Sequence, residues 1–172
     1  WFYEERDVSR RMSETRHVIG LDTSEGVGRD AIAFVLTNSE TAEVAATHKV
    51  KETSVATYAA WMASFMEEYP NTVLIIERRS TGSAIVDALL LILQNKVKDL
   101  HRRLYSKVSQ DFSNDSDQFK EWRRGPSGIP HRYWDHFRKY IGFATDKNKR
   151  AKLYGEVFSA SLKIAAHLIN SE

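Results

Sequence analysis

The chain has 172 residues, with 25 Lys and Arg, 23 Asp and Glu, and no cysteine. This length fits one ordinary domain with its own core, and the lack of cysteine excludes a disulfide framework and any thiolate metal site or nucleophile. No apolar run approaches the roughly 18 residues that a membrane span needs, and the charged N-terminus is unlike a signal peptide, so we expect no membrane partner. Because the first residue is Trp1 and not Met, we expect a fragment of a longer polypeptide.

The charges are distributed unevenly along the chain. Residues 1–95 hold 9 Lys and Arg against 14 Asp and Glu, whereas residues 96–152 hold 15 against 7. Carboxylates gather divalent cations, and basic side chains neutralise phosphates, so this division is typical of a metal-dependent nuclease. A solvated, lysine-rich face would give the same pattern.

The first half of the chain predicts strands. Residues 1–16 carry no clear strand period, and we expect them to form a linker or a helical arm. The following three short runs have strand character and turn residues between them, which predicts an antiparallel meander: residues 17–22, 31–36 and 43–50.

Helical spacing appears next. Apolar residues recur at helical intervals over residues 53–69, and Pro70 ends the pattern, which predicts an amphipathic helix. Residues 72–77 are apolar through their middle, as in a central strand covered on both faces. A Ser-Thr-Gly turn then precedes a helix expected over about residues 83–94.

The second half is less regular. We expect a strand at 104–108, an irregular or hairpin insertion at 110–127, an aromatic and basic stretch at 131–139, a short apolar piece at 141–145 and a helix at 147–169. Three strands, a helix, a central strand and another helix predict an α/β domain with a mixed β-sheet flanked by helices. This order matches ribonuclease H-like folds.

Two carboxylates follow predicted strands. Asp22 ends the first strand and Glu77 ends the central one. Ligands collect at the carboxyl ends of adjacent strands in α/β sheets, so these side chains are expected to meet. Two neighbouring carboxylates repel each other unless a divalent cation lies between them, and Mg²⁺ or Mn²⁺ prefers oxygen ligands. A two-metal site would support phosphodiester hydrolysis, which makes this pair the predicted catalytic residues and metal ligands. Each could instead be a turn or N-cap residue.

Other polar residues surround this pair. Glu25 and Asp30 lie in the turn after the first strand and are candidate metal ligands or solvated hairpin residues. Arg78 and Arg79 directly follow the second carboxylate and are candidate phosphate contacts or ion-pair partners of nearby acids.

Three segments resemble parts of the nuclease domain of tailed-phage large terminases. Residues 19–36 (IGLDTSEGVGRDAIAFVL) are similar to the family's first metal-binding hairpin, in which an Asp precedes a Glu-Gly turn and a second Asp. The residues that fall on this pattern are Asp22, Glu25 and Asp30. Residues 73–89 (VLIIERRSTGSAIVDAL) resemble the second motif, in which the catalytic Glu ends a strand, and Glu77 falls on it. Residues 141–153 (IGFATDKNKRAKL) resemble a third, downstream segment.

The resemblance implies a ribonuclease H-like nuclease domain over residues 17–172 that cuts concatemeric viral double-stranded DNA during genome packaging. It also implies an ATPase domain in the same full-length chain, portal and small terminase proteins as partners, and the host cytoplasm as location. The family often has Asn where Arg79 stands, and its third catalytic Asp follows the helix expected at 147–169. We therefore expect this chain to lack its C-terminal end, since Asp146 precedes that helix.

Basic side chains are expected to contact the DNA backbone without reading its sequence. The predicted DNA-binding residues are Arg78, Arg79, Arg102, Arg103, Arg123, Arg124, Lys147, Lys149 and Arg150. Two alternatives stay open. One is an actin-like nucleotide-binding domain, although the acidic Glu25 and Asp30 would repel a triphosphate. The other is a non-catalytic DNA-binding or docking module on the same fold.

Overall fold

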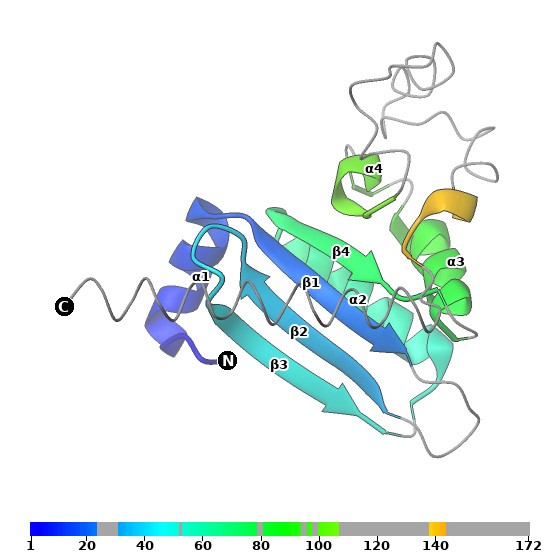
Figure 1. The fold of residues 1–172 in the computed structure, drawn as a ribbon, viewed down its shortest axis with the longest axis horizontal. Helices are drawn as coiled ribbons and strands as arrows, with labels where there is room; N and C mark the ends of the chain where they lie inside the picture. Colours follow the sequence, from blue (N-terminus) through cyan, green and yellow to red (C-terminus); the bar gives the residue numbers. More distant parts are fainter. Residues whose placement is uncertain are drawn as a thin grey trace, which may run out of the picture.

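A computed structural model describes most of the first 106 residues and a short later segment. The described ranges are 1–23, 31–51, 53–78, 81–93, 96–97, 100–106 and 138–143. Their elements are helix α1 (Glu5–Glu14), strands β1 (His17–Thr23), β2 (Ile32–Asn38) and β3 (Val44–Val50), helix α2 (Val55–Glu68), strand β4 (Thr72–Ile76), helices α3 (Thr81–Leu93) and α4 (Leu100–Arg103), and a 3-10 turn, Arg138–Tyr140 (Figure 1). The predicted insertion at 110–127 and the predicted helix at 147–169 lie outside the described residues.

The strands form one mixed sheet in the order β3-β2-β1-β4. β1 pairs antiparallel with β2, and β2 pairs antiparallel with β3, so the predicted meander is confirmed. β4 enters after the α2 crossover and pairs parallel with β1. A mixed sheet flanked by helices confirms the predicted α/β class.

Two short segments lie beside the free edge of β4. The Tyr105 N–H donates to the Leu74 carbonyl at 2.8 Å, and the Phe143 N–H donates to the Ile76 carbonyl at 3.0 Å. These contacts are isolated bridges, so the described part of the strand predicted at 104–108, residues 104–106, shows single bridge positions; residues 107–108 lie outside the described residues. The sequence also failed to predict α4, which is only one turn long.

The core lies between the sheet and the pair α2 and α3, which pack behind it in Figure 1. Alternate residues of each strand are buried, as in β1 and β2, because successive side chains of a strand point to opposite faces. Ser54 caps α2 by accepting the Thr57 N–H at 3.0 Å.

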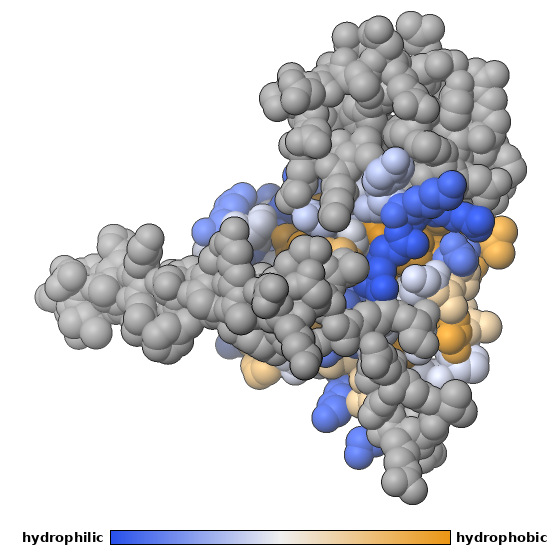
Figure 2. Space-filling model, turned by 45° about the vertical axis from the view of Figure 1, so that its right-hand side comes forward, coloured by the Kyte–Doolittle hydropathy of each residue, from blue (hydrophilic) through white to orange (hydrophobic). Residues whose placement is uncertain are grey.

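The surface of the described residues is mixed in character. Figure 2, turned by 45° from the view of Figure 1, shows hydrophilic and apolar residues side by side on it. Within the described residues, no helix has both the length and the apolar character needed to cross a bilayer.

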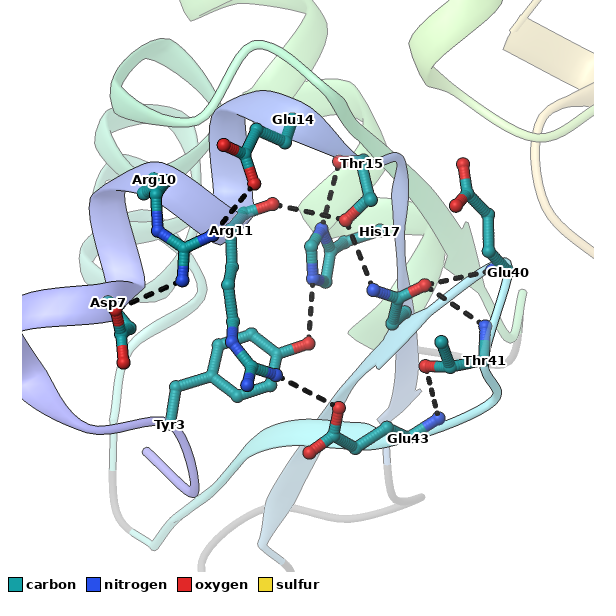
Figure 3. Close-up of polar contacts among 11 residues, drawn as sticks. Tyr3, Asp7, Arg10, Arg11, Glu14, Thr15, His17, Glu40, Thr41 and Glu43 are labelled. Atoms are coloured by element: carbon teal, nitrogen blue, oxygen red, sulfur yellow. Dashed lines mark hydrogen bonds and ion pairs between the residues drawn. The ribbon is translucent and has the colours of Figure 1, made fainter.

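Helix α1 is packed into the domain and is not a free linker. Val8 and Met12, one turn apart, are buried together with Tyr3 in the core. The Arg11 guanidinium lies over the Tyr3 ring at 4.5 Å and donates to a Glu43 carboxylate oxygen at 3.1 Å (Figure 3). The N-terminal residues are therefore held against β3, and their apolar side chains belong to the same core as those of the strands.

Below α1, His17 begins β1 in a fully buried position. Its Nε2 lies 3.1 Å from the Tyr3 hydroxyl, and its Nδ1 lies 3.1 Å from the Thr15 carbonyl oxygen (Figure 3). Burial lowers the pKa of His17, because the charged imidazolium would lose its hydration. This polar cluster lies at the start of β1, six residues before the strand's end.

Candidate functional site

The ends of β1 and β4 bring two predicted site residues side by side. Leu21 of β1 lies opposite Ile76 of β4, and the next N–H, that of Glu77, donates to the Leu21 carbonyl at 3.1 Å. Continuing this register places Asp22 beside Glu77. Neighbouring positions of a ladder share one face of the sheet, about 4.8 Å apart. The two carboxylates therefore leave the backbone from adjacent points on one face.

The pair differs in exposure. Asp22 is exposed, whereas only 8% of Glu77 is accessible to solvent. One carboxylate is thus surrounded by protein, and the other is open to solvent. Two such groups on adjacent strands can share a divalent cation between them, which relieves their mutual repulsion.

The start of α3 packs directly on the backbone of Glu77. A Cβ on Gly82 would lie 2.0 Å from the Glu77 carbonyl oxygen and 2.7 Å from Oγ1 of Thr23, distances that no side chain could adopt. The Thr23 hydroxyl also donates to the Glu77 carbonyl at 3.3 Å. The glycine of the Ser-Thr-Gly turn therefore lets the first turn of α3 close against the ends of both strands.

The metal donor set is only partly visible. Among the described residues, no group of three or more His, Asp or Glu side chains gathers as a metal site would require. The two further candidate ligands, Glu25 and Asp30, lie outside the described residues. The pair that is described offers carboxylate oxygens, which are the donors that Mg²⁺ and Mn²⁺ prefer.

Arg78, a predicted phosphate contact, makes contacts with the protein backbone. Its N–H donates to the Phe143 carbonyl at 2.7 Å, and its guanidinium donates to the Lys139 carbonyl. Gly142 lies between these contacts with a φ of 76°, where a Cβ would come within 2.5 Å of the Ile76 carbonyl oxygen. Arg78 thus fastens residues 138–143 to the end of β4, next to Glu77. Arg79 lies outside the described residues.

Arg103 has a structural position that the sequence did not predict. Its guanidinium donates to the carbonyl oxygens of Tyr69 at 3.0 Å and Thr72 at 3.1 Å, and also to that of Met66. Burial lowers its pKa to about 10. This placement favours a structural role over the DNA-binding role suggested by the sequence. Arg102 is exposed. The remaining predicted DNA contacts lie outside the described residues: Arg123, Arg124, Lys147, Lys149 and Arg150.

Sequence reasoning missed one residue of the site surface, Gly20. It lies on the same face of β1 as Asp22, is exposed, and has only the Val35 carbonyl, at 3.9 Å, near the position of a Cβ. A glycine inside a strand often marks close approach of a ligand or another backbone. The sequence did contain a signal for this residue: Gly20 precedes Asp22 by two positions, which places both on the same face of a strand.

Comparison with known proteins adds a distant structural likeness. No family model matches the sequence, and no curated protein matches it. Among solved structures, the chain is similar to the large terminase nuclease from thermophilic phage G20c, with a TM-score of 0.41 and 17% identity over 47% of this chain and 42% of that one. The match thus spans less than half of that structure. What the structure shows of this chain is a mixed α/β sheet flanked by helices.

Proposed function

We propose that this chain is a divalent-metal-dependent endodeoxyribonuclease domain that cuts concatemeric viral double-stranded DNA during genome packaging. The observation that supports it best is the placement of Asp22 and Glu77 on adjacent strand ends and on one face of the sheet. The similarity of residues 19–36 and 73–89 to terminase nuclease motifs supplies the substrate and the biological setting.

The arrangement suits phosphodiester hydrolysis. Bound Mg²⁺ or Mn²⁺ would supply an activated water and charge neutralisation at the phosphate. Glu77 is suited to hold a cation in a constant position, because its backbone is fixed by β1 and by α3. Asp22 is exposed and can be reached by both the cation and the substrate. Glu25 and Asp30 are the candidates to complete the ligand set.

The DNA contacts and partners belong to the same proposal. Arg102 is the one exposed predicted contact within the described residues, and the basic residues between 123 and 150 would extend the phosphate-binding surface. An ATPase domain in the full-length chain would move the DNA, with portal and small terminase proteins as partners, in the host cytoplasm.

The test is cleavage of supercoiled plasmid by the chain with Mg²⁺ or Mn²⁺. Asp22→Asn and Glu77→Gln should each abolish nicking and weaken metal binding measured by calorimetry, while the fold and DNA affinity persist. Glu67→Gln is the matched control, because Glu67 is an exposed carboxylate paired with Lys96 at 3.2 Å.

Retained cleavage in both site variants would exclude the proposed site. If neither this chain nor a version extended at its C-terminus cleaves DNA with either metal, while salt-sensitive DNA binding persists, the non-catalytic DNA-binding module is favoured.

A further inference from the structure

Strand register extends the site across the sheet to a lysine on the opposite edge. Asp22 of β1 lies opposite Ala33 of β2, and Ala33 lies opposite Lys49 of β3. With Glu77 at the end of β4, these positions form one row across all four strands. Side chains in one row of a sheet leave from the same face.

Neighbouring residues show which face this is. Leu21 and Phe34 are buried in the core, and the His48 ring lies 5.0 Å from the ring of Trp61 on α2. These residues precede or follow the row by one position, so they point toward the helices. Lys49 and the carboxylates therefore lie on the face turned away from α2 and α3.

The position between Asp22 and Lys49 in this row carries a small side chain. Two strand spacings, or about 10 Å, separate the backbones of Asp22 and Lys49. Ala33 lies between them with a single methyl group, and the adjacent row contains Gly20 beside the exposed Val35; a Cβ on Gly20 would meet only the Val35 carbonyl, at 3.9 Å. A polynucleotide backbone could approach the sheet closely here.

The charge of Lys49 is available to a ligand. Its side chain is exposed, and none of the acids in the described part of the chain pairs with it. With its backbone about 10 Å from that of Asp22, Lys49 starts from a position two strands away from the carboxylates. A phosphate next to the one at the carboxylates is therefore the partner that we assign to its ammonium group.

We propose that Lys49 binds a DNA phosphate that flanks the cleaved one, so that the cut strand crosses β1 and β2 over Gly20 and Ala33. This inference rests on the proposed nuclease function. Lys49 would be a positioning residue for the DNA. It belongs to residues 1–95, in which acidic residues outnumber basic ones, so the charge distribution did not predict a DNA contact there.

The test measures binding of a short duplex DNA to the chain by fluorescence anisotropy over a range of salt concentrations, with EDTA to prevent cleavage. Lys49→Gln should weaken binding and reduce the slope of log affinity against log salt by about 0.9, the value for one lost phosphate contact. Lys49→Arg should restore the slope. The matched control is Lys96→Gln. Lys96 follows the C-terminal end of α3 and is paired with Glu67 of α2, so this variant should leave the slope unchanged.

A second variant tests the path over the sheet. Gly20→Val adds a side chain whose Cβ would meet only the Val35 carbonyl, at 3.9 Å, and valine is a strand-favouring residue, so we expect the protein to stay folded, which circular dichroism checks, and to bind DNA more weakly. An unchanged salt slope in Lys49→Gln, unchanged affinity in Gly20→Val, or a wild-type chain without salt-dependent binding would overturn the inference.

Cleavage kinetics distinguish a failure of the Lys49 proposal from a failure of the proposed nuclease function. In a cleaving chain, Lys49→Gln should raise KM and leave kcat little changed, whereas Asp22→Asn should abolish cleavage and keep the full salt slope. A fall in kcat at unchanged KM would contradict the positioning role of Lys49. If neither this chain nor a version extended at its C-terminus cleaves, the nuclease proposal fails, while the binding measurements still decide whether Lys49 contacts a phosphate.

Discussion

Replacing Gly82 with alanine should destabilise the domain, although alanine normally favours a helix. In a helix interior this change is worth about 0.5–1 kcal/mol in favour of alanine. At this position the new Cβ would lie 2.0 Å from the Glu77 carbonyl oxygen, which is backbone and cannot rotate away. Overpacking of this kind costs about 1–3 kcal/mol. Taking the middle of each range, we expect a net loss of about 1.3 kcal/mol, which lowers Tm by roughly 3–5 °C in a chain of this size.

The assay is thermal and urea unfolding followed by circular dichroism, with Gly20→Ala as the matched control. A Cβ on Gly20 meets only the Val35 carbonyl, at 3.9 Å, so this variant should be as stable as wild type or slightly more stable. Plasmid cleavage well below Tm should also fall in Gly82→Ala, because relief of the clash moves either α3 or Glu77. Equal shifts in Tm for the two glycine variants, or a Gly82→Ala protein as stable as wild type, would refute the packing argument.

Three further predictions concern the supports of the sheet. Gly142→Ala should lower Tm, because φ is 76° and the new Cβ would lie 2.5 Å from the Ile76 carbonyl oxygen; an unchanged Tm would contradict this. Arg103→Met should cost about 1–3 kcal/mol in urea unfolding, because it removes the guanidinium donor from the part-buried carbonyls of Met66 and Thr72, yet leave the salt slope of DNA binding unchanged. The lowered pKa of His17 means that the unfolded chain binds the proton more tightly, so stability should decrease as pH falls below about 6.5. His17→Gln should remove that part of the pH dependence, and an identical pH profile in the variant would exclude His17 as its source.

The four strands and the two long helices were predictable from apolar periods, apolar runs and the turn residues between them. Residues 17–22 and 72–77 alternate or run apolar between clear turn signals, and the structure places strands there. Residues 1–16 were expected to form a linker or a helical arm, and α1 is a helix; its packing against the core was not predicted, because its apolar stripe, Val8 and Met12, is narrow and lies among charged residues. α4 has four residues, too few for any period to show.

Side-chain roles were less predictable than elements. Arg103 belongs to a basic stretch that suggests DNA contact, but its chain position beside the C-terminal end of α2 turns its guanidinium toward carbonyl groups. Lys49 belongs to the acidic half of the chain, and nothing in the sequence predicted it as a DNA contact. Its relation to Asp22 depends on two successive strand registers, which are set by tertiary pairing.

Glu77 is held by several elements, and this has a consequence for how the site responds to change. Its N–H is bonded to β1, its carbonyl is bonded by Thr23 and packed by Gly82, and the residues on either side of it, Ile76 and Arg78, are bonded to Phe143. The position of this carboxylate therefore depends on β1, on α3 and on the 141–143 segment together. A site held on rigid elements keeps its geometry only while all of them keep theirs. Substitutions far from the carboxylates, at the start of α3 or at Gly142, should therefore reduce cleavage at temperatures where the domain is still folded.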